Sequence, residues 1–139
     1  MISSFRGAYY FLSNMYPCPV VYEGLEFKCA EAAFQAAKTL NLEMRKRFTQ
    51  MDGFEAKRFG RSVKLRDDWD KVRLPVMSWV LLDKFTRNAD LKEKLLMTGD
   101  LPLIEGNNWN DRFWGVCNGV GDNNLGKLLM RLRKHLSKG

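Results

Sequence analysis

The fold is decided by residues 27–38, which read FKCAEAAFQAAK. The apolar side chains that recur at the three- and four-residue spacing of a helix face are Ala30, Ala33, Phe34 and Ala37. Five alanines between positions 30 and 37 add strong helix propensity. The segment is therefore predicted to form a helix with a thin, alanine-lined face that another element can approach closely.

One polar stripe runs along the same predicted helix. Glu31, Gln35 and Lys38 stand at i, i+4 and i+7, so a carboxylate, an amide and an ammonium group share one side. The helix dipole favours a charged carboxylate at this end by roughly 0.3 to 1 kcal/mol. Burial acts the other way and is stronger, because it can raise a carboxyl pKa by about 3 to 5 units. Two interpretations stay open: a solvated face, which is the more common arrangement, and a covered, reactive Glu31.

The composition describes a globular chain with excess positive charge. Its 139 residues suit one domain spanning 1–139, and 45% hydrophobic with 12% aromatic residues supply a core. The net charge of +7 predicts an anionic partner, either a phosphorylated small molecule or a nucleic acid. Since no apolar run approaches ~20 residues and the N-terminus is unlike a leader, a cytoplasmic location without a membrane partner is expected.

Cysteine and histidine usage narrows the chemistry. Cys18, Cys29 and Cys117 are widely spaced and form no C-x-x-C pair, and His135 is the only histidine. A disulfide framework, a metal site and Ser-His or Cys-His catalysis are therefore not expected. We predict no cofactor, so any chemistry must come from carboxylates.

Short elements are predicted around the alanine-rich helix. A hairpin is expected over residues 20–27, turning at Glu23-Gly24. Further helices are expected at 41–51, from the capping signal 52–55 to Gly60, from Leu74 onward with Pro75 in the first turn, at 88–98, and at 125–136. Gly60 either ends its helix or admits a close backbone. Trp69 and Trp79 are expected in the core, and the Pro102-containing segment 101–105 is at most an edge strand.

Two segments carry candidate binding groups. In Tyr10-Phe11-Leu12-Ser13-Asn14, Phe11 and Asn14 are candidates for a pocket wall and its polar contact, although Ser13 and Asn14 also suit the capping of a turn. Lys57, Arg61 and Lys64 stand at i, i+4 and i+7. Such a run is usually a solvated face, but a phosphate also needs convergent cations.

The stretch from Asn107 to Gly115 mixes two tryptophans, three asparagines and an aspartate without periodicity, which is typical of a loop. Asp111 offers a second carboxylate as a candidate partner of Glu31 in space, and Trp114 offers a flat face for a heterocycle. The alternative is an aromatic cluster that seals the core. The glycine-rich run 118–126 opens the last predicted helix. Its backbone amides are a weak candidate for a phosphate site.

Taken together, six motifs resemble the NADAR family, also called YbiA-like. They are Tyr10 to Asn14, Tyr22-Glu23-Gly24, Glu31 to Lys38, Ala56 to Arg61, Asn110 to Gly115 and Gly121 to Gly126. No single motif is specific, but the set keeps its order and covers nearly the whole chain. Many relatives have Glu-His at the third motif, whereas Ala32 follows Glu31 in this chain.

The resemblance implies a mainly α-helical fold, here a single compact domain with a small N-terminal β-hairpin, and cleavage of N-glycosidic bonds. The leading hypothesis is an N-glycosidase that hydrolyses phosphorylated riboflavin-pathway intermediates to ribose 5-phosphate and an aminopyrimidine. One alternative is an ADP-ribosyl glycohydrolase acting on ADP-ribosylated DNA or protein. Another is a non-catalytic module that binds ADP-ribose.

The chemistry of such a bond suits two carboxylates. Its cleavage builds oxocarbenium character on the sugar, and needs an activated water and a proton for the departing nitrogen. We expect Glu31 to act as general base or oxocarbenium stabiliser and Asp111 to be the second catalytic carboxylate, without assigning which does which. The predicted substrate-binding residues are Phe11, Asn14, Gln35, Lys57, Arg61, Trp114, Asn118 and Asn123.

Overall fold

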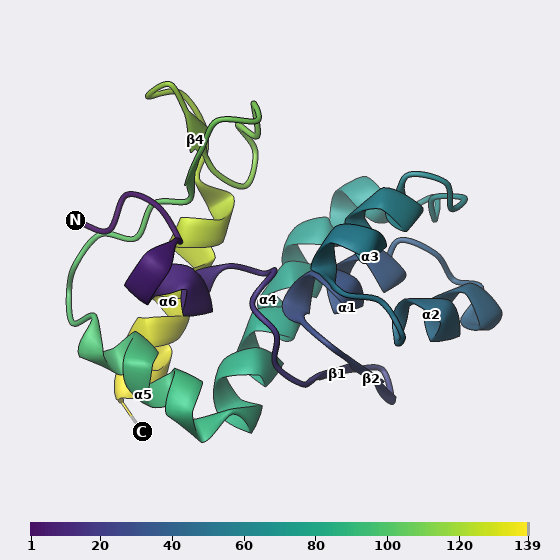
Figure 1. The fold of residues 1–139 in the computed structure, drawn as a ribbon, viewed down its shortest axis with the longest axis horizontal. Helices are drawn as coiled ribbons and strands as arrows, with labels where there is room; N and C mark the ends of the chain where they lie inside the picture. The colour runs from purple at the N-terminus through teal and green to yellow at the C-terminus, as the bar shows by residue number, and fades with distance from the viewer. Residues whose placement is uncertain (139) are drawn as a thin grey trace. The chain divides into compact units, whose positions relative to one another are not determined.

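The computed structural model describes residues 1–138, which form two compact units (Figure 1). We call Asn14–Asn88 the hairpin unit. The terminal unit joins Met1–Ser13 to the part of the chain that begins at Ala89. Seven helices, one of them 3-10, and two two-stranded sheets occur within residues 1–138, so the predicted mainly helical fold is confirmed. That the two units act as one domain stays a prediction.

The hairpin unit begins with the predicted hairpin. Its elements are β1 (Val20–Tyr22), β2 (Leu25–Phe27), α1 (Ala30–Ala36), α2 (Leu42–Phe48), α3 (Gly53–Gly60) and α4 (Trp69–Arg87). The strands are antiparallel, with Val20 opposite Phe27. Both turn residues have positive φ, 46° at Glu23 and 83° at Gly24, which suits the tight turn predicted there.

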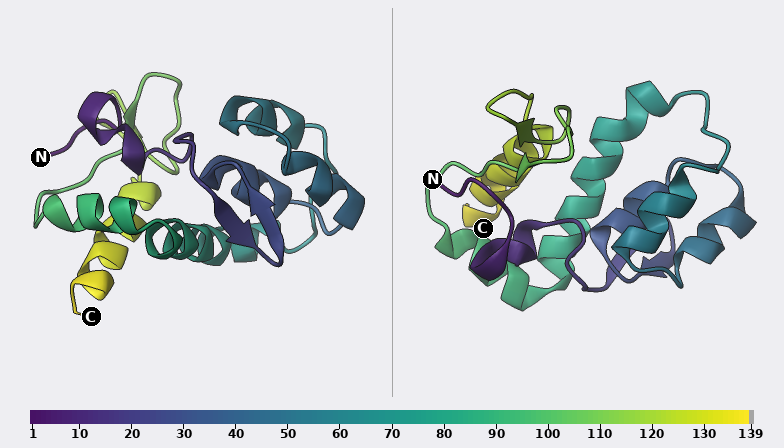
Figure 2. Two further views of the ribbon diagram at one scale, coloured as in Figure 1. Left: turned by 60° about the horizontal axis from the view of Figure 1, so that its bottom comes forward. Right: turned by 45° about the horizontal axis from the view of Figure 1, so that its top comes forward.

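Helix α1 is the centre of this unit. It contacts α2, α3, α4 and both strands, as the views in Figures 1 and 2 show. The four alanines of α1 and Ala37, which follows its last residue, are all 0% exposed. Because alanine adds so little bulk, α3 reaches α1 at Gly60, where an added Cβ would lie 2.0 Å from Gln35 Oε1. The prediction that Gly60 ends its helix is confirmed, as is the capping box of Asp52 and Glu55 at the start of α3. The group that comes close to Gly60 is the Gln35 side chain and not a backbone segment.

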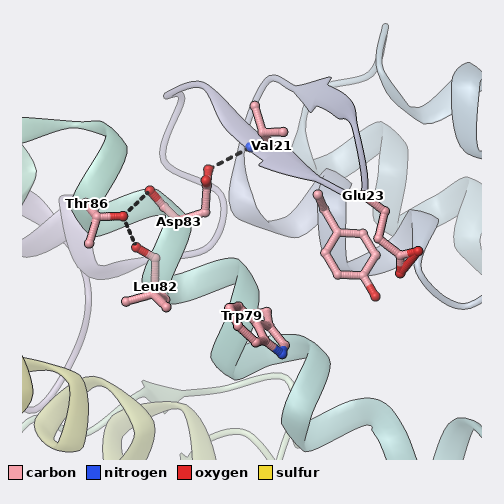
Figure 3. Close-up of a pocket in the computed structure, with 7 residues that line it drawn as sticks. Val21, Glu23, Trp79, Leu82, Asp83 and Thr86 are labelled. Atoms are coloured by element: carbon pink, nitrogen blue, oxygen red, sulfur yellow. Dashed lines mark hydrogen bonds between the residues drawn. The ribbon is translucent and has the colours of Figure 1, made fainter.

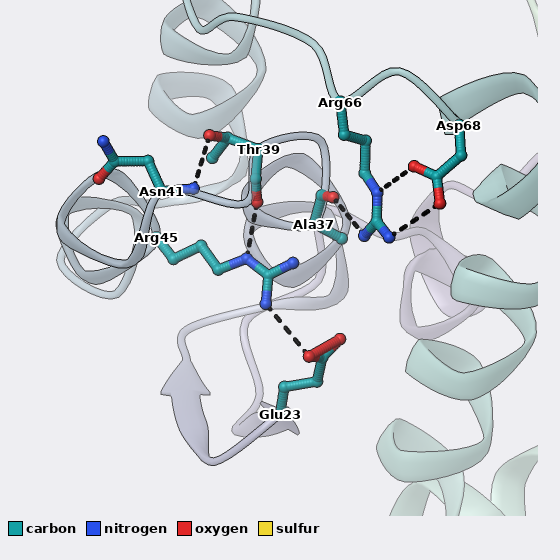
Figure 4. Close-up of polar contacts among 7 residues, drawn as sticks. All are labelled: Glu23, Ala37, Thr39, Asn41, Arg45, Arg66 and Asp68. Carbon is teal, nitrogen blue, oxygen red and sulfur yellow. Dashed lines mark hydrogen bonds and ion pairs between the residues drawn. The ribbon is translucent and has the colours of Figure 1, made fainter.

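Two arginines hold the C-terminal end of α1 (Figure 4). Arg45 is buried; its Nε donates to the Thr39 carbonyl at 2.8 Å, and its Nη1 lies 3.3 Å from Glu23 Oε2. Arg66 donates to the Ala37 carbonyl at 3.4 Å. Carbonyls beyond the last helical turn lack partners within the helix. These bonds therefore fix the end of α1 and the backbone on both sides of Lys38.

Helix α4 differs from the prediction. It begins at Trp69, so Pro75 lies inside the helix and cannot donate to the carbonyl one turn earlier. Trp69 packs on Phe34 with ring centroids 5.1 Å apart. This contact, between residues far apart in the sequence, accompanies the start of α4 at Trp69. Trp69 is 7% exposed, as predicted, but Trp79 is 65% exposed and its prediction as a core residue is wrong. The buried side of α4 includes Met77. Trp79 follows it by two residues, so its side chain points about 200° away around the helix.

The terminal unit has fewer regular elements. They are η1 (Gly7–Leu12), α5 (Ala89–Met97), β3 (Gly106–Asn107), β4 (Val116–Cys117) and α6 (Asn124–Ser137). Helices α5 and α6 pack together, and β3 pairs with β4 in parallel. Segment 101–105 contributes one isolated bridge, from Leu103 to Ile2. None of the helices within residues 1–138 is long and apolar enough to cross a membrane.

Candidate active site

Glu31 lies in the first turn of α1, where the chain holds it by its backbone and its side chain. Its N–H donates to the Asn14 carbonyl at 2.9 Å, which places Asn14 beside the start of the helix. Its Oε2 accepts a hydrogen bond of 2.6 Å from Gln35 Nε2, one turn farther on. The side chain is neither fully exposed nor fully buried. The predicted stripe therefore exists, and Gln35 orients the carboxylate.

Asn14 and Gln35 each carry a buried oxygen that accepts no hydrogen bond from any residue the structure describes. Asn14 is 8% exposed and Gln35 5% exposed. Asn14 Nδ2 lies 3.5 Å from Met77 Sδ, but Asn14 Oδ1 and Gln35 Oε1 have no hydrogen-bond partner within residues 1–138. An unsatisfied buried polar atom costs about 1–3 kcal/mol. Two such acceptors on residues bonded to Glu31 are what a site for a hydroxyl-bearing ligand would require.

A group of cations lies beside the carboxylate. Burial lowers the pKa of Lys38; Glu31 opposes this shift, whereas Lys57 and Arg61 reinforce it by repulsion. Lys57 and Arg61 flank Gly60 on α3, the residue that touches Gln35. Lys57 and Arg61 therefore act on Lys38, which shares its stripe with Glu31. The structure adds Lys38, which the sequence analysis placed on the stripe without giving it a role.

Asp111 shapes its own loop in the terminal unit. Its Oδ1 accepts hydrogen bonds from the backbone N–H groups of Phe113 at 3.2 Å and Trp114 at 2.9 Å. Asn107 brackets it, because Asn107 Oδ1 accepts from the Asp111 N–H and Asn107 Nδ2 donates to the Asp111 carbonyl. The Trp114 ring meets Phe113 edge to face at 4.8 Å. The carboxylate therefore orders the segment that carries Trp114.

The other predicted binding residues of this unit have structural contacts. Asn118 is exposed, with φ of 52°, in the turn between Cys117 and Val120. Asn123 is buried; it accepts from the Glu105 N–H and donates to the Leu103 carbonyl, both at 3.0 Å. Phe11 is 5% exposed. The roles of these residues in substrate binding stay predictions.

The start of α6 does not suit a phosphate. The N–H of Asn124 donates to the Phe113 carbonyl at 3.2 Å, and the N–H of Leu125 donates to the Trp114 carbonyl at 3.0 Å. These amides are the ones that a bound anion would need. The prediction that the glycine-rich run binds a phosphate through its backbone amides is therefore wrong for the N–H groups of Asn124 and Leu125.

The ten predicted site residues divide between the units. Asn14, Glu31, Gln35, Lys57 and Arg61 belong to the hairpin unit, where the contacts above bring them together. Phe11, Asp111, Trp114, Asn118 and Asn123 belong to the terminal unit. A shared cleft for Glu31 and Asp111 stays a prediction. Ala32 is 0% exposed, so the position that follows Glu31 is sealed in the core.

Known proteins are similar to this chain over nearly its whole length. The family model of the NADAR domain matches residues 4–137. The N-glycosidase YbiA of Shigella boydii is 37% identical over 129 residues, which are 90% of this chain and 80% of that protein. The riboflavin biosynthesis protein VVA0006 of Vibrio vulnificus is 34% identical over 132 residues, 92% of this chain but 36% of that protein. The NMR structure of Escherichia coli YbiA superimposes with a TM-score of 0.87 at 35% identity, covering 99% of this chain and 83% of that one.

Proposed function

Because the chain belongs to the NADAR domain family and is an N-glycosidase, we propose that it hydrolyses phosphorylated ribosylaminopyrimidine intermediates of riboflavin biosynthesis. The products are ribose 5-phosphate and an aminopyrimidine. The printed names of relatives support this substrate class, since one is called a riboflavin biosynthesis protein and others N-glycosidases. The charge of +7 agrees with an anionic substrate.

The observation that carries the proposal is the pair of unsatisfied acceptors beside Glu31. Asn14 Oδ1 and Gln35 Oε1 are buried and accept no hydrogen bond within residues 1–138. A ribose presents hydroxyl groups, each of which can donate one hydrogen bond. We assign these two oxygens to the sugar hydroxyls, so that substrate binding satisfies both.

The phosphate of the substrate is assigned to the cations. Lys57 and Arg61 lie one turn before and one residue after Gly60, which meets Gln35, and the charges of both lower the pKa of Lys38. A phosphate neutralises such a cluster and accepts several charge-assisted hydrogen bonds. The same cluster draws anionic substrates toward Glu31.

The reaction adds one water across the bond between sugar C1 and nitrogen. As that bond breaks, its electron pair leaves with the nitrogen and positive charge develops on the sugar ring. The ionised Glu31, oriented by Gln35, stabilises that charge or takes a proton from the water that attacks C1. Asp111 is the second carboxylate in our proposal, and Trp114, on the same ordered loop, supplies a face for the heterocycle.

The experiment is a direct assay of ribose 5-phosphate release. Purified chain is incubated with the phosphorylated pyrimidine ribosides and, separately, with ADP-ribosylated DNA. We expect release of ribose 5-phosphate from the ribosides and no release of ADP-ribose from the DNA. Turnover of the DNA alone would overturn the substrate assignment.

A matched pair of variants tests Glu31. Glu31→Gln keeps the shape of the side chain and should lower kcat by at least about 100-fold, the range given for a positioned acid–base group. Glu43→Gln makes the same change on α2, where the side chain is 82% exposed, and should leave activity unchanged. Full activity in Glu31→Gln would remove Glu31 from the mechanism.

A further inference from the structure

A hollow lies in the hairpin unit, between the hairpin and α4 (Figure 3). Its volume is about 410 Å³. It is lined by Val21, Tyr22, Glu23, Trp79, Leu82, Asp83 and Thr86. It shares no residue with the Glu31 site. Met77 of α4 contacts Asn14, whereas Trp79 is on the opposite side of the same helix.

The hollow has aromatic and aliphatic walls. The Trp79 indole is 65% exposed, an unusual position for a large apolar ring. Val21 and Leu82 are half-buried beside it. Burial and a hydrogen bond to Glu23 raise the pKa of Tyr22 to about 12, so its phenol stays protonated at neutral pH. A flat ring that enters the hollow can therefore stack on Trp79 next to uncharged surface.

The polar groups of the hollow are mainly acceptors. The Asp83 carboxylate accepts from the Val21 N–H at 2.7 Å and from Arg87 at 2.9 and 3.0 Å. The Glu23 carboxylate accepts from Arg45 at 3.3 Å, and the neighbouring Tyr22 phenol lowers the pKa of Glu23. A carboxylate has about four acceptor positions, so both keep capacity for a further donor.

The charge in this hollow does not favour phosphate. Each carboxylate is matched by one arginine, Arg45 for Glu23 and Arg87 for Asp83. The seven lining residues include no lysine or arginine, although the whole chain carries a net charge of +7. The hollow therefore offers a stacking face and carboxylate oxygens, without excess positive charge.

We propose that this hollow is a binding site for a planar nitrogen heterocycle that bears amino groups. The ring stacks on Trp79 while its N–H groups donate to Glu23 and Asp83. A volume of about 410 Å³ lies within the range of small-molecule pockets and accommodates one or two fused rings. The aminopyrimidine released from the substrate belongs to this class; its identification as the natural ligand rests on the proposed function.

The test follows the indole N–H signals of the four tryptophans by NMR, with 2,4-diaminopyrimidine as the probe. We expect a saturable shift of the Trp79 signal. We also expect at least a tenfold weaker affinity in Trp79→Ala, with turnover of the riboside unchanged. Trp109→Ala is the control, because it removes an indole that is 50% exposed outside the hollow, and its affinity should match that of the parent chain.

Two further probes separate the alternatives. Pyrimidine without amino groups should bind at least tenfold more weakly, and ribose 5-phosphate should leave the Trp79 signal in place. An unmoved Trp79 signal with diaminopyrimidine, equal affinity for both pyrimidines, or a shift caused by ribose 5-phosphate would each overturn the proposal. Absence of riboside hydrolysis with an intact Trp79 response would instead refute only the proposed function.

Discussion

Replacing Gly60 by alanine should disturb the proposed site although no charged residue is replaced. The added Cβ would lie 2.0 Å from Gln35 Oε1 and 2.8 Å from Gln35 Cδ. Since such contacts are not tolerated below 3.0 Å, α3 or the Gln35 side chain must move by about 1 Å. Gln35 is 5% exposed and bonded to Glu31 at 2.6 Å, so its displacement also moves the carboxylate.

The magnitude follows from two opposing effects. Overfilling a packed contact costs about 1–3 kcal/mol. Alanine recovers up to about 0.5–1 kcal/mol of helix propensity, less here because Gly60 is the last residue of α3. The net loss of stability should be about 1–2 kcal/mol. If the proposed function holds, a misplacement near 1 Å should lower kcat by up to about 100-fold.

A double-mutant cycle isolates the contact. Urea unfolding and ribose 5-phosphate release are measured for Gly60→Ala, Gln35→Ala and the double variant. With Gln35 truncated, the nearest atom known to remain beside the new Cβ is Gln35 Cβ, at an ordinary 3.5 Å. The stability penalty of Gly60→Ala should then fall below about 0.5 kcal/mol, a coupling of at least about 0.5 kcal/mol. An equal penalty in both backgrounds would refute the steric reasoning.

Two further predictions concern buried ionisable groups. Burial lowers the pKa of Lys84, which is 0% exposed, from 10.5 to about 8, so between those pH values the unfolded chain binds more protons than the folded one. The free-energy cost of burying Lys84 should therefore fall as pH rises from about 8 to 10.5. Urea unfolding should show that Lys84→Met stabilises the chain at pH 7 and that this gain shrinks across the same pH window. A stability difference between the two chains that does not change with pH would contradict this. Burial raises the pKa of Cys29 to about 11, so its thiol should resist iodoacetamide at pH 8 in the folded chain and react in urea. Mass spectrometry follows the alkylation, and rapid alkylation of the folded chain would count against the burial of Cys29.

The sequence predicted those elements whose signals are local. The Glu23-Gly24 turn, the alanine-rich helix and the Asp52 capping box each depend on residues within a few positions of one another, and all three occur. The start of α4 was missed because the Trp69–Phe34 contact joins residues far apart in the chain. Trp79 was also misplaced, since it lies two residues after the buried Met77 and therefore on the exposed side of α4.

The candidate site was predicted only in part. Residue type and spacing identified Glu31, Gln35 and the cations of α3 as candidates. They did not reveal that Asn14 Oδ1 and Gln35 Oε1 have no hydrogen-bond partner among residues 1–138, because an unsatisfied acceptor depends on every neighbour that surrounds it. The backbone contacts of Asp111 depend in the same way on how its loop folds back on itself.

The shortness of α1 ties activity to folding. A seven-residue helix does not persist in water, because isolated helices below ~12–15 residues are marginal even when rich in alanine. Its shape is imposed by α2, α3, α4 and the hairpin that enclose it. Glu31 therefore has no preformed local scaffold to keep it in position once these neighbours separate. A partly melted hairpin unit should be inert, so heat should abolish turnover and the packing around α1 in one coincident transition.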